Sequence, residues 1–256
     1  MISCKLSVAC ASIPLTIVKM STIIVIFNGL LYRPLFNGLI FLYNTLPGHD
    51  FGIAIIALTI IIRLLFYPLF QKQMKAQKEM ALIQPKIKEV QKKYKNEKEK
   101  QAQAIMDLYK EHKVNPFSGC LPMLIQLPIL IAFFQVLRTD MDPSRLNGLY
   151  WFIKNPEVIN PMFIGLVDLA KSNYVLAVLA GAAQFIQSKM TLPAGGLQKG
   201  QGTDFASLMS TQMIYFMPVL TVMIAWQLPA GLPLYWLVLT IVGIIQQYLM
   251  NRKKDL

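Results

Sequence analysis

The chain has 256 residues, of which 55% are hydrophobic and only 15% charged, and its mean hydropathy is +0.47. This composition excludes an ordinary soluble domain and indicates an all-α polytopic membrane protein. The formal net charge of +12 suits anionic partners such as a membrane surface, RNA or acidic segments of another chain. With three cysteines, two histidines and no ligand spacing among them, the sequence predicts no metal site and no cofactor.

Residues 1–31 form an apolar segment that Lys19 interrupts. An uncleaved signal anchor, a signal peptide and an upstream extension with Met20 as the true start all fit it, whereas a lipoprotein signal at Cys10 lacks a proper preceding apolar run. Residues 32–48 repeat apolar side chains at helical spacing but are too short to span a bilayer, so they predict an amphipathic helix on the outer membrane surface. Its apolar positions are Leu35, Phe36, Leu39, Ile40 and Tyr43.

Residues 49–253 predict a core of five transmembrane helices. A spanning helix needs about 20 mostly apolar residues, and prolines are tolerated in it when neighbouring helices satisfy the freed carbonyls. The segments that meet this length, the third of them by extending on both sides, are 52–70, 119–137, 174–186, 211–228 and 231–250.

Residues 71–113 carry 12 lysines against 6 acidic residues and predict a helical hairpin between the first two spans. One apolar seam follows helical spacing, and a shorter one follows the solvated run "YKNEKEK", so the two helices can pack antiparallel. A solvated basic loop would explain the charge but not the seams. The seam residues are Ile83, Ile87, Val90 and Tyr94, then Ile105, Leu108 and Tyr109.

The distribution of basic residues predicts the orientation. The basic block 71–113 and the tail "NRKKDL" are expected in the cytoplasm, whereas residues 138–171 balance four bases against four acids and are expected outside. Five spans satisfy this arrangement with the N-terminus outside and the C-terminus inside.

Arg63 lies within the apolar run "IIALTIIIRLLFYPLF", where insertion scales put the cost of an arginine at about 2.5–3.5 kcal/mol. No acidic residue lies in any predicted span to pair with it, but amides do. Snorkelling to the cytoplasmic surface is one explanation, and interhelical bonding is the simplest role for any single glutamine. Together, however, these residues favour a hydrated groove open to the cytoplasm. The amides are Gln126, Gln184, Gln187, Gln212, Gln227, Gln246 and Gln247.

No phosphate loop, nucleophile elbow or HExxH motif occurs, so the sequence predicts no enzyme. Two other classes compete with a binding role for the groove. A small-molecule transporter would show two structural repeats, which five spans with one hairpin lack. An assembly scaffold would use the same surfaces and stays open.

The runs "YNTLPGHDFGIAIIALTIIIRLLFYPLF", "NPFSGCLPMLIQLPI" and "LPAGLPLYWLVLTIVGIIQQYLMNR" resemble the YidC family of membrane-protein insertases. The similarity extends over about residues 32–253. It implies lateral insertion of newly made proteins into the bilayer without nucleotide hydrolysis. By this resemblance, Arg63, Gln187 and Trp236 match groove positions, and Gln126 and Gln184 join them as candidate groove amides.

The resemblance also implies partners: membrane-protein clients, the lipid bilayer, the ribosome and the Sec translocon, with the protein a monomer in the bacterial plasma membrane. Hairpin contacts are expected at Lys86, Lys88, Lys92 and Lys93. The sequence departs from large Gram-negative members because nothing between its N-terminal segment and first span could build their periplasmic domain. Its short tail also disfavours strong ribosome tethering there.

Overall fold

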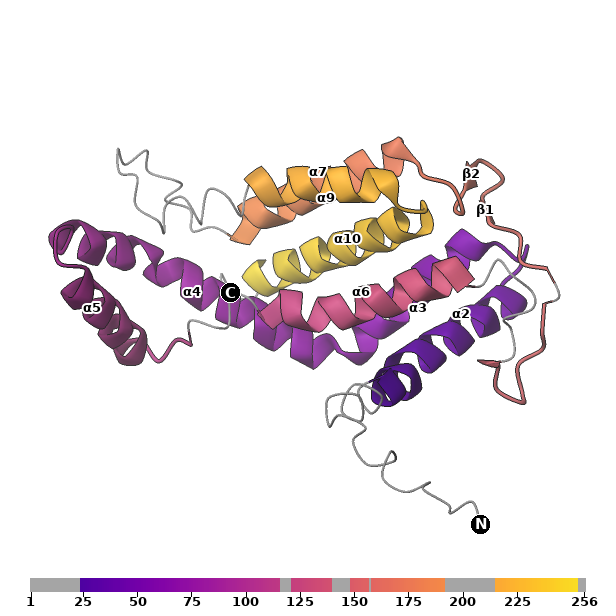
Figure 1. Cartoon of the computed structure of the whole chain (residues 1–256), viewed down its shortest axis with the longest axis horizontal. Helices are drawn as coiled ribbons and strands as arrows, with labels where there is room; N and C mark the ends of the chain where they lie inside the picture. The colour runs from indigo at the N-terminus through magenta and orange to yellow at the C-terminus, as the bar shows by residue number, and fades with distance from the viewer. Residues whose placement is uncertain (1–23, 116–120, 140–147, 157, 192–214, 253–256) are drawn as a thin grey trace, which may run out of the picture.

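The computed structural model in Figure 1 describes residues 24–115, 121–139, 148–156, 158–191 and 215–252. The predictions made for the first 23 residues, for Gln212, for the first residues of the spans 119–137 and 211–228 and for the end of the tail lie outside this part of the chain. The described elements are η1 (Asn28–Tyr32), α2 (Arg33–Thr45), α3 (Phe51–Leu65), α4 (Tyr67–Lys93), α5 (Lys98–Glu111), α6 (Leu121–Thr139), β1 (Met162–Phe163), β2 (Val167–Asp168), α7 (Tyr174–Thr191), α9 (Met217–Gln227) and α10 (Gly231–Arg252).

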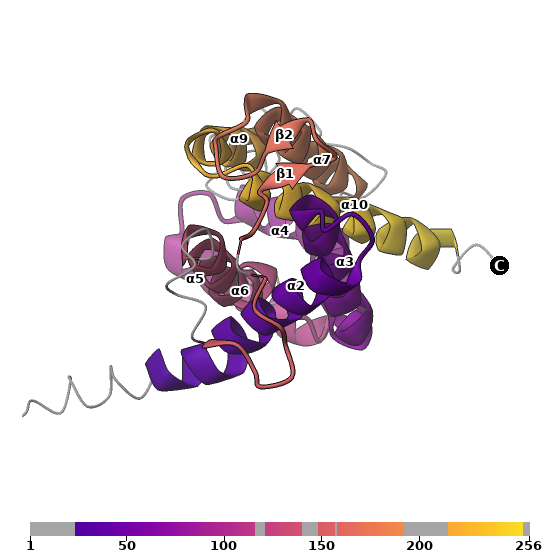
Figure 2. The same ribbon diagram turned by 90° about the vertical axis from the view of Figure 1, so that its right-hand side faces the viewer.

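Helix α10 lies in the middle of the bundle, packed against α7 on one side and α3 on the other (Figures 1 and 2). Helix α9 covers α7, while α2 packs on α3 and α6. Helices α3 and α10 run in the same direction, because a Cβ at Gly231 would lie 3.4 Å from Ile55 whereas one at Gly243 would lie 3.1 Å from Arg63. Their first halves therefore lie side by side, as do their second halves.

The start of α3 and its end have identifiable causes. Asp50 caps the helix, since its Oδ1 accepts a hydrogen bond of 2.9 Å from the Ile53 N–H. The chain bends by 74° after Leu65, and α4 then begins with Pro68 in its first turn, where a proline is tolerated. The first predicted span, which was expected to reach Phe70, is therefore a bent pair of helices.

By length and composition, two described helices can cross a membrane: Ile24–Thr45 and Gly231–Arg252. The bent pair α3 and α4 makes a third if it is one span. These helices agree with the predicted class, a mostly helical membrane protein. The prediction of five spans stays a prediction, because α6, α7 and α9 do not meet the same test within the described residues.

The helix ending at Thr45 differs from its prediction in length. It is continuous from Ile24 through the π-helical turn η1, so no helix end falls at the expected boundary between residues 31 and 32. The added apolar turns make it long enough to span, whereas residues 32–48 alone were judged too short. Its predicted apolar face is buried against the other helices, at Leu35, Phe36, Leu39, Ile40 and Tyr43.

Helices α4 and α5 leave the bundle together at one end of the molecule and are joined by a turn at residues 94–97 (Figure 1). They contact each other, and Gln101 Nε2 donates to the Gln91 carbonyl at 3.0 Å. Of the predicted seam, Ile83 and Ile87 are buried and Val90 is half-buried. The face between these helices thus follows the apolar spacing, and their cytoplasmic location stays a prediction.

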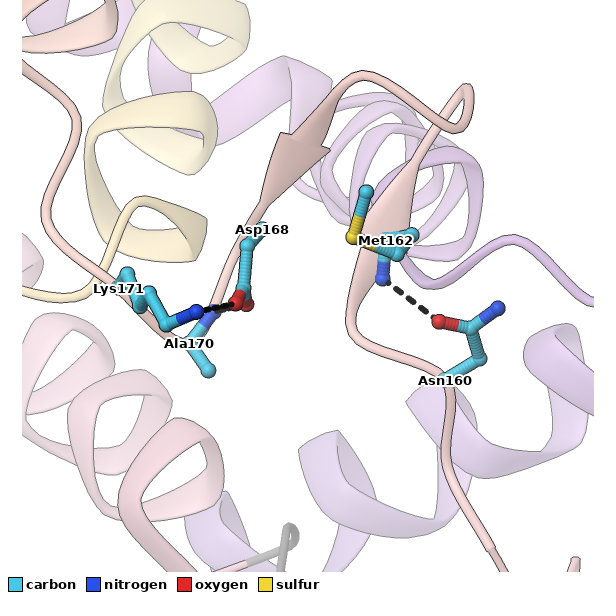
Figure 3. A network of polar contacts seen from close by, with 5 residues as sticks. All are labelled: Asn160, Met162, Asp168, Ala170 and Lys171. Atoms are coloured by element: carbon cyan, nitrogen blue, oxygen red, sulfur yellow. Dashed lines mark hydrogen bonds and ion pairs between the residues drawn. The ribbon is translucent and has the colours of Figure 1, made fainter.

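The connection between α6 and α7 contains the small antiparallel pair β1 and β2, which the all-α prediction did not include. Figure 3 shows how polar contacts hold its ends: Asn160 Oδ1 accepts from the Met162 N–H at 3.1 Å, and Asp168 accepts from the Ala170 N–H and from Lys171 Nζ, both at 3.0 Å. The Lys171 ammonium keeps the pKa of the Asp168 carboxyl below its ordinary value.

Candidate functional site

Arg63 lies in the last turn of α3, and its side chain is only 8% exposed. Its Nη1 donates to Gln246 Oε1 at 3.2 Å, and its Nη2 donates to the Leu239 carbonyl at 3.1 Å, so both bonds go to α10. The Phe70 ring at the start of α4 also covers the guanidinium, at 4.0 Å from the ring centroid. Residues of α10 and α4 therefore contact this cation of α3.

The guanidinium keeps hydrogen-bonding capacity in this setting. Its Nε is buried and has no acceptor among the residues that the structure describes. No described carboxylate forms an ion pair with it either, although a guanidinium is shaped to bind a carboxylate with two parallel bonds. The site can therefore receive an acidic group without giving up an existing ion pair.

Gly243 lets two polar side chains approach α10 closely. A Cβ at this position would collide with the Gln187 amide and would lie 3.1 Å from Arg63 Nη2. The glycine thus brings the Gln187 amide of α7 and the guanidinium of α3 to the same spot on α10. Beside it, Gln247 Nε2 donates to Thr191 Oγ1 at 3.2 Å and continues the polar contact between α7 and α10.

The other predicted groove residues lie at different places around α10 and α7. Gln126 Nε2 donates to the Tyr235 hydroxyl at 2.8 Å, one helical turn before Leu239. Gln184 is half-buried one turn before Gln187 on α7. Trp236 is half-buried and packs against the apolar core. The structure therefore brings Gln187 to Arg63, links Gln126 to the adjacent turn of α10, and gives Trp236 an apolar setting.

Two contributors to the site, Phe70 and Gly243, were not predicted, and Gln246 was one of the amides that indicated the groove but was not singled out as a candidate groove residue. The amide of Gln246 was visible as one of two late glutamines of the last span, and Gly243 precedes it by three residues, so both fall on one helix face. Phe70 had no such signal, because it reaches Arg63 only through the bend after Leu65.

The four hairpin lysines predicted as contacts lie on or near the surface. Lys86 Nζ is 2.7 Å from His112 Nε2 and so links α4 to the end of α5. Lys92 is exposed, Lys88 is half-buried, and Lys93 Nζ lies 5.3 Å from the centroid of the Tyr94 ring. Most of this positive charge is thus available to a partner.

Within the described residues there is no cluster of His, Cys, Asp and Glu that could hold a metal ion. The site presents a fixed positive charge with amides beside it. The fold and the site together define a helical membrane protein that holds a buried cation between its helices.

The chain belongs to the 60Kd inner membrane protein family, whose model matches residues 41–255. It is 38% identical over 225 residues to the membrane protein insertase YidC of Fusobacterium nucleatum, which is 87% of this chain and 98% of that protein. The insertases of the same name from Syntrophus aciditrophicus and Geobacter sulfurreducens are 36% and 35% identical, and this chain spans 36% and 38% of their lengths. The resemblance to the YidC family is confirmed.

Proposed function

We propose that this protein inserts newly made proteins laterally into a bacterial membrane, with Arg63 as the receiving charge in a hydrophilic groove. The observation that carries the proposal is the buried guanidinium with an unsatisfied Nε and no described carboxylate beside it. Opposite charges attract far more strongly in a low-dielectric setting than in water, so an acidic residue of a client's translocated tail is drawn to this point.

The proposed mechanism lowers the barrier for moving a polar segment across hydrocarbon. Phe70 covers the guanidinium in the structure, so a client tail reaches it when the start of α4 moves aside. The Gln187 and Gln246 amides then supply hydrogen bonds to the tail, and the client's own apolar helix partitions into lipid. No nucleotide hydrolysis and no covalent step are needed.

The proposed topology has five spans, an outer N-terminus and a cytoplasmic C-terminus. The lysine-rich α4 and α5 are then a cytoplasmic hairpin that meets clients or the ribosome by charge, and the protein acts as a monomer, alone or beside the Sec translocon. Single-cysteine labelling in intact cells tests this arrangement at Glu97, in the turn before α5. A label that reacts there from outside would reverse the proposed orientation.

The function itself is tested with the purified protein in liposomes and a single-span client. An insertase protects the client's translocated tail from added protease without any other protein or nucleotide. A scaffold binds the client but leaves its tail accessible, and a small-molecule transporter does neither. The last two outcomes would contradict the proposal.

A further inference from the structure

The connection between α6 and α7 exposes an unusual amount of apolar surface. Two short stretches carry it: the aromatic run 150–152, in which Trp151 is 96% exposed, and the hairpin tip 163–166, in which Leu166 is 82% exposed. Phe152 and Ile164 are exposed as well, at 58% and 62%. Single exposed apolar residues are ordinary, but a cluster of this kind marks an interaction surface.

Both stretches are fixed to the helices rather than free. The Tyr150 N–H donates to Asn37 Oδ1 of α2 at 2.6 Å, which anchors the aromatic run. At the hairpin tip, the Ile164 N–H donates to Asp50 Oδ2 at 2.5 Å, and Gly52 leaves room for the Phe163 ring to lie directly on α3. The carboxylate that caps α3 therefore also holds the hairpin tip at the first turn of that helix.

The backbone conformation of the hairpin tip is unfavourable for the isoleucine that it carries. Ile164 has φ of 52° and Gly165 has φ of 69°. The Leu166 N–H donates to the Phe163 carbonyl at 3.0 Å, so these are the two central residues of a β-turn. Turns with positive φ at both central positions favour Asn-Gly or Asp-Gly, and a β-branched residue is among the least suited to the first of them. The chain accepts this strain and thereby keeps an exposed isoleucine at the tip.

We propose that this connection is an interfacial anchor, in which the aromatic run and the hairpin tip insert among lipid headgroups and the upper acyl chains beside the start of α3. Trp and Tyr favour the boundary between water and lipid because one end of each ring is polar. Apolar side chains are also exposed on the helices to which the connection is fixed, at Phe41 of α2 and Ile53 and Ile60 of α3.

The charges in this connection agree with lipid as the occupant. Asp168 and Lys171 neutralise each other through their ion pair of 3.0 Å. Lys154 is exposed beside the aromatic run and can reach a lipid phosphate while its stem stays in the apolar layer. The anchor would fix the depth and tilt of the first turn of α3, and through that helix the depth of Arg63.

Site-directed spin labelling tests the anchor without any client. Its result is therefore independent of insertion activity, and the anchor and the proposed function can each be contradicted separately. Cys4, Cys10 and Cys120 are replaced by serine, and single cysteines are introduced as Trp151→Cys and Leu166→Cys. Lys98→Cys on α5 serves as the water-exposed control, and Val178→Cys, on the exposed face of α7, serves as the lipid-exposed control. The full chain is reconstituted in phosphatidylethanolamine and phosphatidylglycerol vesicles.

The readout is the accessibility of each label to oxygen, which partitions into lipid, and to a water-soluble nickel chelate. The anchor predicts that both labels are severalfold more accessible to oxygen, relative to nickel, than the label at position 98, at a depth of about 5–10 Å below the lipid surface. Accessibility to nickel equal to that of position 98 would make the connection a water-facing loop. Exclusion of both reagents would mean a protein contact, and either result would overturn the proposal.

Discussion

The first and second halves of α3 and α10 lie in one continuous pair of helices but bury different kinds of side chain. In the first halves, Phe51, Ile55, Leu232 and Tyr235 are at most 3% exposed within the apolar core. In the second halves, the buried residues include Thr59, Arg63, Gln246 and Gln247. One helix pair thus changes from an apolar interior to a polar one along its length.

We expect the apolar halves to determine the stability of the fold and the polar halves to determine its activity. Burial of apolar surface and close packing stabilise the first halves. A buried cation with a donor left unsatisfied adds little stability, because the loss of hydration offsets what it gains from its partners. The polar half is therefore expected to tolerate changes that the apolar half does not, but to lose activity through them.

Removing the charge tests the polar half most severely. Arg63→Ala is expected to leave the melting temperature unchanged and to reduce insertion of acid-tailed clients by about 10- to 100-fold, the value of a hydrogen bond to a charged group. Arg63→Lys should keep much of the activity, because a point charge suffices where no bidentate partner is fixed. The measurement is protease protection of matched clients with and without tail acids. Equal losses for both clients would show that the charge is not the receiving element.

Truncating a core ring tests the apolar half. Phe51 of α3, 1% exposed, meets Tyr43 edge-on with ring centroids 6.0 Å apart, and Phe51→Ala is expected to reduce the free energy of unfolding by about 3–5 kcal/mol. Ile61→Ala on the same helix is the matched control, since that side chain is 48% exposed. Thermal unfolding in detergent provides the comparison. Equal melting temperatures for the two variants would mean that this half does not hold the fold together.

Gly243→Ala tests the contact between the polar side chains. The added methyl displaces the Gln187 amide and Arg63 Nη2, which are flexible ends and can move, so a several-fold loss of insertion with little loss of stability is expected. Gly29→Ala is the control, because a Cβ there meets nothing within 4 Å. Insertion rates and melting temperatures are measured for both. A clearly lowered melting temperature of Gly243→Ala would show that this glycine is needed for helix packing rather than for the polar contact.

The smallest change in insertion is expected from substitutions in the helical hairpin α4–α5, which lies outside both halves. Replacing Lys86, Lys88, Lys92 and Lys93 by glutamine removes exposed charge, so insertion should weaken modestly at low salt and match the unaltered protein at high salt. Insertion is measured across a salt series. If the deficit persists at high salt, the lysines act through packing, as the contact between Lys86 and His112 would allow.

Sequence patterns predicted the features that depend on local spacing. The last span, expected at 231–250, is the helix Gly231–Arg252, and the apolar positions from Leu35 to Tyr43 are buried as their spacing indicated. Burial of Ile83 and Ile87 likewise follows from helical periodicity. Arg63 could be predicted as a site residue because a charged side chain within an apolar run is costly in a membrane and usually serves a function.

Features that depend on bends and on which helices meet were not predictable in this way. The bend at Phe66 places Phe70 over Arg63, and periodicity contains no information about the direction of a helix after a break. Trp236, assigned to the groove by resemblance, is half-buried against the apolar core, and its place in the groove stays a prediction. Gln246, three residues after Gly243 and six after Thr240, becomes a partner of Arg63 only once α3 and α10 are known to be parallel.

A tilt of α4 about the bend at Phe66 would displace the two ends of this helix by very different distances. Helix α4 has 27 residues and is therefore about 40 Å long, with its pivot at one end. A tilt of about 10° would carry its far end roughly 7 Å but would move Phe70, about 6 Å from the pivot, by only about 1 Å. A tilt of this size would therefore carry the far end of the helical hairpin through a wide arc while the ring over the guanidinium stays nearly in place. Only a much larger swing of α4 would uncover the charge.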